Sequence, residues 1–338
     1  MDRNTPLITI KEVAELAQVS QSTVSRTLND HPTVKEKNRQ KVYEAIEKLG
    51  YKPNAFAQAL ASSRSNSIGM VVGSLDGPFF GPLMHQVEDT VREKNLHLIL
   101  TSGHQDKEKE TDAIRFLQSK QVDGLILNSD KLEDEALIKL VEENPATIIV
   151  NRHIESIAKH CVFIDNELGG YIATEHLLKS GHRKIACITG PKDNLDSQNR
   201  LLGYKKALAD YQVNFDESLI AEGRFDHHGN YDVANNLLSN NPGITAVFCQ
   251  NDNIALSVYD VCGLLNLKVG EDMSVVGFDN DIYSQYLRPK LTTVNFPNRE
   301  MGLEAAKRVI SLLNKTDHQV DNALTPSLIE RHSVKVFN

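Results

Sequence analysis

The sequence predicts a small all-α headpiece at the N-terminus, followed by a much larger α/β body made of two lobes. Three observations predict this division. Apolar residues recur at helical spacing as far as Gly50, whereas from Ser67 short apolar runs alternate with amphipathic stretches. Between these parts, residues 53–61 form an Ala-rich stretch that is too short to be a stable helix alone. The 338 residues are enough for more than one domain.

The first helix is predicted to begin at Ile10. Thr9 and Glu12 have the spacing of a capping box, in which a hydroxyl and a carboxylate satisfy reciprocal backbone donors at a helix start. The apolar face of this helix is expected to consist of Val13, Leu16 and Ala17.

A second short helix is expected after a tight turn at residues 18–20, with Val24 and Leu28 as its apolar stripe. Its other side chains are short polar groups or arginine, which suit hydrogen bonds to base edges and phosphates in a DNA major groove. An ordinary three-helix bundle also has polar outer faces, so these residues alone leave a purely structural role open. The polar set is Gln21, Ser22, Thr23, Ser25, Arg26 and Asn29.

A third helix is expected to run from a second capping box, Thr33 to Glu36, to Gly50. The Ala-rich stretch after it can start at Pro53 or Asn54, and a marginal helix in this place is suited to being ordered by a partner such as DNA. The expected divisions are residues 1–52 for the helix-turn-helix headpiece, 53–65 for the hinge, and 66–338 for the body.

Charge is distributed unevenly along the chain, although the formal net charge is −8. Residues 1–64 carry ten Lys and Arg against seven Asp and Glu, whereas the remainder carries 27 against 38. The excess positive charge therefore lies on the headpiece, where a nucleic acid would bind, and an acidic body discourages wrong docking onto DNA.

Neither targeting signals nor metal motifs are found in the sequence. The charged N-terminus lacks the apolar core of a secretory signal, and no apolar run is long enough to span a membrane. The four cysteines are widely spaced without a C-x-x-C pair, which indicates reduced, mostly buried thiols, and the twelve histidines show no ligand spacing. We therefore expect a cytoplasmic protein without a cofactor or metal.

The alternation after Ser67 predicts parallel sheets that are covered on both faces, in two doubly wound lobes. Such lobes place a ligand at the carboxyl ends of their strands. Carboxylates, amides and a guanidinium there suit a sugar, whose hydroxyls both donate and accept hydrogen bonds. Asn and Asp before a helix are also ordinary caps, so both roles stay open for Asn251 and Asp252. The polar candidates at or near strand ends are Asn151, Arg152, Arg200, Asn251 and Asp279.

Aromatic rings would complete a sugar site by covering the apolar face of a pyranose. The candidates are Phe79, Phe80 and Phe296, and Asp76 is a further polar candidate in the same segment as the first two.

The segments TIKEVAELAQVSQSTVSRTLN and YKPNAFAQAL, followed by a sugar-receptor-like body, resemble the LacI/GalR family of bacterial transcription repressors over essentially the whole chain. Three segments are similar to its galactose-repressor branch: DGPFFG at residues 76–81, SQYLRPKLTTVNFP at 284–297 and SLIERHSV at 327–334. The resemblance implies a two-lobed body like a type I periplasmic binding protein. The implied N-lobe comprises about residues 66–163 and 293–322, and the C-lobe about 164–292 and 323–338.

The resemblance also implies that two headpieces bind one pseudo-palindromic operator, with each second helix in the major groove. Gln21, Ser22 and Arg26 then stand at the base-reading positions, although the galactose branch has smaller apolar residues at the first two. The other DNA-binding residues expected in the headpiece are Thr9, Ser20, Thr23, Ser25 and Asn29.

The hinge is expected, from the same resemblance, to form a helix in the central minor groove. Asn54 would start this helix, and Leu60 would wedge the groove open. Ala57 and Ala61 are small enough to let the paired hinge helices sit deep in the groove.

In the body, Arg200, Asn251 and Asp279 stand where the family's effector-contacting residues stand, and Phe296 stands at a contact position that varies among members. The branch implies a small sugar effector, galactose-like, that releases the protein from its operator. The chain ends directly after its last predicted strand, without the leucine-heptad helix that joins some members into tetramers, so a homodimer is expected.

No Walker-type, G-x-S-x-G or G-x-G-x-x-G sequence appears at a strand-to-helix turn, so the sequence favours a binding protein over an enzyme. Two alternatives stay open. One is a sugar-binding receptor without a DNA function, and the other is a co-repressor-type regulator with a non-sugar ligand.

Overall fold

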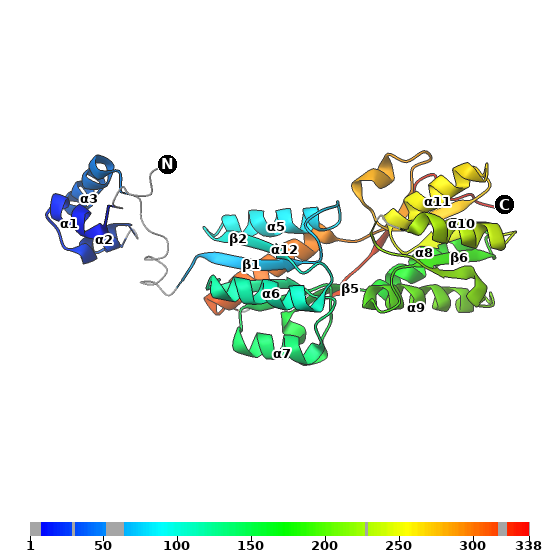
Figure 1. Ribbon diagram of the computed structural model, residues 1–338, viewed down its shortest axis with the longest axis horizontal. Coiled ribbons are helices and arrows are strands. Elements are labelled where there is room, and N and C mark those ends of the chain that lie inside the picture. Colours follow the sequence, from blue (N-terminus) through cyan, green and yellow to red (C-terminus); the bar gives the residue numbers. More distant parts are fainter. Residues whose placement is uncertain (1–7, 29–30, 52–63, 227–228, 317–322, 338) are drawn as a thin grey trace. The chain divides into compact units, whose positions relative to one another are not determined.

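The computed structural model describes residues 8–28, 31–51, 64–226, 229–316 and 323–337 (Figure 1). The chain divides into two compact units, Met1–Ser65 and Asn66–Asn338. We describe each unit by itself.

The first unit contains three helices, α1 (Ile10–Ala17), α2 (Gln21–Leu28) and α3 (Glu36–Leu49). Their apolar faces meet in one small core, which confirms the helical headpiece. Leu16 is the exception, because its side chain is 41% exposed; the prediction for this residue is wrong, and Ala14 lies in the core instead. The core consists of Val13, Ala14, Ala17, Val24, Val42 and Ala45.

One of the two predicted capping boxes is present. The Glu12 carboxylate accepts hydrogen bonds from the backbone amide of Thr9 at 2.7 Å and from its hydroxyl at 2.9 Å. The second box is wrong: Lys35 is the N-cap of α3, and the Thr33 hydroxyl pairs with the ring of His31 at 2.9 Å. Helix α3 ends at Gly50, as expected, in the left-handed conformation with φ of 63°.

The N-lobe of the second unit is a six-stranded sheet in the order β11-β5-β4-β3-β1-β2, with every adjacent pair parallel. Neighbouring side chains of β1 point to opposite faces, so Met70 joins the core under α5 and α12 while Val71 joins the core under α6 and α7. The strands are β1 (Ser67–Val72), β2 (His97–Ser102), β3 (Gly124–Asn128), β4 (Thr147–Val150), β5 (Cys161–Ile164) and β11 (Ala323–Leu324), and the helices are α5 (Phe80–Arg92), α6 (Lys107–Ser119), α7 (Asp134–Glu143) and α12 (Asn298–Asn314).

The C-lobe is a second six-stranded sheet in the order β12-β10-β9-β8-β6-β7, parallel except for β12. Helices again cover both faces, as the alternating sequence pattern predicts. The strands are β6 (Ile185–Thr189), β7 (Ile220–Glu222), β8 (Ala246–Cys249), β9 (Ser274–Asp279), β10 (Thr292–Asn295) and β12 (Ser327–Ile329), and the helices are α8 (Asn166–Lys179), α9 (Leu195–Asp210), α10 (Asn230–Asn240) and α11 (Asp252–Leu264). Short 3-10 turns are η1 (Glu155–His160), η2 (Glu217–Leu219) and η3 (Ile282–Gln285).

The chain passes between the lobes three times: after β5, between β10 and α12, and between β11 and β12. Two expected lobe bounds are wrong by a few residues. Thr293 pairs with Gly277 in the C-lobe sheet, and Ala323 pairs with Phe163 in the N-lobe sheet. The reason is that β10 and β11 each complete their pairing before the chain crosses.

All four cysteines are buried and free, as predicted. In the part of the chain that the structure describes, no helix combines the length and the apolar character needed to cross a membrane.

Candidate functional site

The exposed face of α2 is the first candidate site. Gln21, Ser22 and Arg26 are exposed on this helix, while Val24 and Thr27 hold its other face in the core. The side chains that could reach a DNA groove are therefore free of packing roles, as a recognition helix requires.

Several predicted DNA-binding residues have local hydrogen-bond partners, including Ser22, whose hydroxyl pairs with that of Ser20 at 2.8 Å. The Ser20 hydroxyl accepts a hydrogen bond from the Thr23 backbone amide at 3.2 Å, at the start of α2, and pairs with the Thr23 hydroxyl at 2.9 Å. Ser25 is half-buried, and Thr9 belongs to the capping box of α1. Five predicted positions lie outside the described residues: Asn29, Asn54, Ala57, Leu60 and Ala61.

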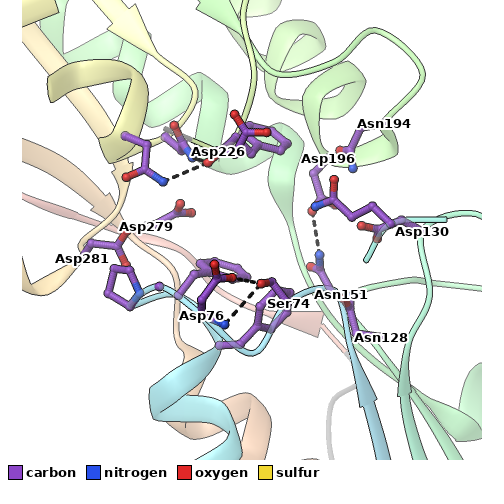
Figure 2. A pocket seen from close by; sticks show the side chains of 18 of the residues that line it. Ser74, Asp76, Asn128, Asp130, Asn151, Asn194, Asp196, Asp226, Asp279 and Asp281 are labelled. Atoms are coloured by element: carbon purple, nitrogen blue, oxygen red, sulfur yellow. Dashed lines mark hydrogen bonds between the residues drawn. The ribbon is translucent and has the colours of Figure 1, made fainter. Parts of the chain in front are cut away.

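The second candidate site is a cavity of about 330 Å³ between the two lobes of the body (Figure 2). Its lining comes from loops and helix starts at the carboxyl ends of strands in both sheets, as doubly wound lobes predict. The N-lobe supplies Ser74, Asp76, Gly77, Pro78, Phe79, Phe80, Gln105, Asn128, Asp130 and Asn151. The C-lobe supplies Asn194, Asp196, Arg200, Phe225, Asp226, Asn251, Asn253, Asp279 and Asp281.

Seven of the nine predicted effector-binding residues lie on this lining, and two do not. The Arg152 guanidinium turns away into the N-lobe, where it donates to the Leu132 carbonyl at 2.7 Å and to the Asp134 carboxylate. Phe296 is 3% exposed and packs edge-to-face behind Phe79, with 4.9 Å between ring centroids. The seven on the lining are Asp76, Phe79, Phe80, Asn151, Arg200, Asn251 and Asp279.

Arg200 is fixed at the floor of the cavity by contacts within the C-lobe. Its side chain donates to the Asn166 side chain at 2.8 Å and to the Gln250 carbonyl at 2.5 Å, and its guanidinium lies 3.7 Å from the centroid of the Phe278 ring. The residue is 2% exposed, and burial lowers its pKa, while nearby Asp279 opposes that shift. A cation held in this way is pre-oriented to donate to a ligand oxygen.

Asp279 ends strand β9 in an unusual backbone conformation, with φ of 101°. The nearest Arg200 nitrogen is 3.7 Å from Asp279 Oδ1, which is an ion pair without a hydrogen bond. Burial raises the pKa of this carboxyl well above its usual range, and the Arg200 charge limits the rise. The strained backbone and the unsatisfied oxygen together indicate that the Asp279 carboxyl binds a ligand.

Asn251 caps a helix and also lines the cavity. Its side-chain oxygen accepts from the Ile254 backbone amide at 2.9 Å and caps α11, and its amide nitrogen donates to the Phe225 carbonyl at 2.9 Å. Neighbouring Asp252 is buried and does not line the cavity; it accepts from the Asp281 backbone amide at 2.8 Å and from the Thr293 hydroxyl at 2.7 Å. Asp252 therefore supports the loop that carries Asp279 and Asp281.

Three buried oxygens on the lining lack any hydrogen-bond donor: Oδ1 of Asn128, of Asn151 and of Asp279. An unsatisfied buried polar atom costs roughly 1–3 kcal/mol, so native structures retain few of them. All three are acceptors, so a ligand rich in hydroxyl or amine donors would satisfy them.

The two lobes also bond to each other beside the cavity. The Asn151 amide of the N-lobe donates to the Asp196 carboxylate of the C-lobe at 2.6 Å (Figure 2). Lys131 of the N-lobe pairs with Asp193 of the C-lobe at 2.5 Å. Asp130 lies at the same end of the cavity. Burial, together with the negative charges of Asp196 and Glu110, raises the pKa of Asp130 to about 7.

Glu110 of α6 was not identified from the sequence, and it positions the loop after β3. Its buried carboxylate accepts from the Ser129 hydroxyl at 2.5 Å and from the backbone amides of Asp130 and Lys131 at 3.2 and 3.3 Å. The loop that carries Asp130 into the cavity is therefore held by one acid from the neighbouring helix.

Replacing Glu110 by alanine should lower the free energy of unfolding by about 2–4 kcal/mol, because three donors lose a charged acceptor in a buried place. Chemical denaturation measures this loss. Glu108→Ala is the matched control, since Glu108 is exposed on the same helix, and it should change stability by less than about 0.5 kcal/mol. Equal effects of the two substitutions would remove Glu110 from this role.

Sequence reasoning missed several lining residues, including Asn128, Asp130, Asp196 and Asp226. Asn128 ends the apolar run GLILN, so the strand-end rule that found Asn151 could have found it too. The three aspartates lie in loops or at a helix start, without a comparable signal. No cluster of three or more His, Cys, Asp or Glu suited to a metal ion occurs within the described ranges.

Comparison with known proteins shows which family the chain is similar to. Residues 9–54 match the bacterial regulatory proteins of the lacI family, and residues 174–334 match the periplasmic binding protein-like domain. The chain is 34% identical to the HTH-type transcriptional regulator GalR of Escherichia coli (strain K12), over 97% of this chain and 96% of that protein. It is 35% identical to the HTH-type transcriptional repressor PurR of Aliivibrio fischeri (strain MJ11), over 97% and 98%.

Solved structures also match this chain over nearly its whole length. The lac repressor dimer bound to operator and the anti-inducer ONPF has a TM-score of 0.86 at 27% identity, covering 97% of this chain and 99% of that chain. A complex of the transcriptional regulator CelR with cellobiose has a TM-score of 0.71 at 30% identity, covering 96% and 99%. The chain belongs to the lacI family of bacterial regulatory proteins.

Proposed function

We propose that this protein is a transcriptional repressor that binds a pseudo-palindromic operator and is released from it by a small sugar. The observation that carries the proposal is the combination, in one chain, of an exposed polar face on α2 with a cavity whose buried acceptors lack donors. A receptor that only bound sugar would have no use for the first feature, and a constitutive DNA-binding protein would have no use for the second.

The DNA arm of the proposal rests on Gln21, Ser22 and Arg26. Amide, hydroxyl and guanidinium groups can each bond base edges or phosphates, and arginine can bond a guanine with two hydrogen bonds. Because α2 has only eight residues, its exposed face spans few bases, which favours two copies reading two half-sites. The lac repressor, whose structure was solved as a dimer on its operator, supports a homodimeric arrangement for this chain as well.

Replacing Arg26 by alanine should weaken operator binding by about 1–3 kcal/mol per headpiece, the range for one lost base-reading contact. A gel-shift titration at fixed salt measures it. Lys139→Ala is the matched control, because it removes the same charge from an exposed position on α7 of the body. If both variants bind operator as tightly as the wild type does, Arg26 does not contact the DNA.

The proposal of a sugar ligand rests on the side chains that line the cavity. Amides and carboxylates provide acceptors, Arg200 provides a fixed donor, and Phe79, Phe80 and Phe225 provide apolar faces, which together suit a pyranose. The 34% identity with GalR favours a galactose-like hexose, and the CelR–cellobiose complex is a relative with a bound sugar. We infer release rather than tighter binding on addition of ligand, from the same branch.

The decisive experiment is a gel-shift selection with random palindromic DNA, followed by titration of the selected operator with a panel of monosaccharides and disaccharides. The proposal expects a specific operator and its release by at least one sugar. A protein that binds sugar but selects no DNA would be a plain receptor, and tighter DNA binding on addition of ligand would reverse the sign of the coupling.

A further inference from the structure

The charges around the cavity are strongly one-sided. Six aspartates line it, from both lobes, against one arginine, and the lining residues that the structure describes include neither lysine nor histidine. Arg224 pairs with Asp226 at 2.8 Å, and Arg200 lies 3.7 Å from Asp279 and near Asp196. Two arginines against six carboxylates still leave an excess of negative charge. The six are Asp76, Asp130, Asp196, Asp226, Asp279 and Asp281.

Two of these carboxylates lie on opposite sides of the boundary between the lobes. Asp130 follows β3 of the N-lobe and Asp196 lies in the first turn of α9 in the C-lobe, and Figure 2 shows both at the same end of the cavity, beside Asn151. Burial and then the charge of Asp196 raise the pKa of Asp130, while Lys131 and Arg152 oppose the rise, so the carboxylates of Asp130 and Asp196 repel when both are ionised. Bringing the lobes together therefore costs free energy unless Asp130 takes up a proton or a positive charge lies between these two groups.

The unsatisfied atoms point to the same kind of ligand. Asn128 and Asp279 are 4% and 7% exposed, and each holds a buried Oδ1 without a donor. A hydroxyl donates one hydrogen bond, whereas a protonated amine donates three and is charged. One amine can therefore bond more of the acceptor oxygens on this lining than one hydroxyl can.

We propose that the ligand is an amino sugar: a hexose in which a protonated amine replaces one hydroxyl and lies between Asp130 and Asp196. This inference rests on the proposed sugar-responsive function and specifies its ligand class. The amine neutralises the repulsion between a residue of the N-lobe and a residue of the C-lobe. It therefore stabilises the arrangement in which the cavity-lining residues of the two lobes lie close together. A neutral hexose fills the same volume without that effect.

Calorimetry on the full-length protein, in buffer with EDTA, tests the inference with two matched sets of sugars. One set is galactosamine, galactose and N-acetylgalactosamine, and the other is glucosamine, glucose and N-acetylglucosamine. In at least one set the free amine should bind about tenfold or more tightly than both neutral sugars, as one added charge-assisted contact predicts.

The variant Asp130→Asn should reduce the ratio between the dissociation constants of the neutral sugar and the amine to less than about threefold. Asp260→Asn, at an exposed position on α11, removes the same charge elsewhere and should leave the ratio unchanged. A neutral hexose that binds as tightly as its amine overturns the inference and leaves the proposed function standing. Binding of a neutral sugar only when calcium replaces EDTA also overturns it, because a metal ion rather than an amine would then offset the carboxylates. If none of the six monosaccharides binds, the amino-sugar inference fails, and the sugar-responsive part of the proposed function fails as well only if no sugar of the wider panel, disaccharides included, releases the operator.

Discussion

A protein in which Arg200 is replaced by alanine should bind its operator about as tightly as the wild type does and should no longer respond to ligand. Arg200 is the one cation on the described lining of the cavity, and its position is fixed by Asn166, Gln250 and Phe278. Its loss removes the charged donor to the ligand and leaves Asp279 without a counter-charge, so ligand affinity should fall by at least about 100-fold. The headpiece belongs to a separate compact unit, so operator contacts are retained.

The measurement is operator affinity with and without the releasing sugar, for the wild type and for each variant. Arg183→Ala is the matched control, because Arg183 is an exposed arginine of the C-lobe that donates to backbone carbonyls outside the cavity. Arg200→Lys keeps the charge but not the planar geometry, so a similar loss in that variant would show that the paired contacts matter. Release that persists in Arg200→Ala, with folding verified by circular dichroism, would exclude this residue from the response.

The headpiece was predictable from the sequence because its signals are local. The capping box at Thr9 and Glu12 and the terminal Gly50 can each be recognised from residues within one helical turn, and the structure contains both. The failure at Thr33 has a local cause too: its hydroxyl bonds the His31 ring, so the helix starts later, after Lys35. Leu16 is exposed because Val13, Ala14 and Ala17 define the core face of α1, and Leu16 lies beyond the edge of that face, on the side of Val13 away from Ala14.

The cavity was predictable only in part, since a strand-end rule does not give the direction of a side chain. Asn151 and Arg152 are adjacent and equally good candidates by sequence, yet Asn151 faces the C-lobe while Arg152 turns back to Asp134. The left-handed backbone of Asn151, with φ of 59°, accompanies this separation. Asp130 was not predictable for a different reason: its place depends on Glu110, which is 20 residues away in sequence.

Phe296 lies in the region that the resemblance identifies, but it is not on the cavity lining. It lies in the chain segment between β10 and α12, beside the cavity, but its ring is covered by Phe79. Phe79 and Phe80 line the cavity, and their rings are nearly perpendicular to each other with 4.9 Å between centroids. Phe296 is therefore expected to act by supporting Phe79.

Adding one methyl group at Gly203 should destabilise the body strongly, because the methyl group would meet backbone atoms. Helices α8 and α9 pack backbone against backbone, so a Cβ at Gly203 would lie 1.9 Å from the Glu167 carbonyl oxygen and 2.5 Å from the Tyr171 amide nitrogen. The contact is reciprocal, because a Cβ at Gly170 would lie 2.0 Å from the carbonyl oxygen of Arg200. Neither helix backbone can move away without displacing the other.

Gly203→Ala should therefore lower the free energy of unfolding by about 3 kcal/mol or more, at the upper end of overpacking effects because backbone atoms meet rather than flexible side chains. It should also weaken ligand binding, since α9 carries Arg200 and α8 carries its partner Asn166. Gly263→Ala is the control with the opposite sign: this glycine is exposed on α11 with open space around it, so alanine should stabilise the helix by about 0.5–1 kcal/mol. Chemical denaturation of both variants measures these changes, and a Gly203→Ala protein as stable as the wild type would mean that α8 and α9 are not in backbone contact.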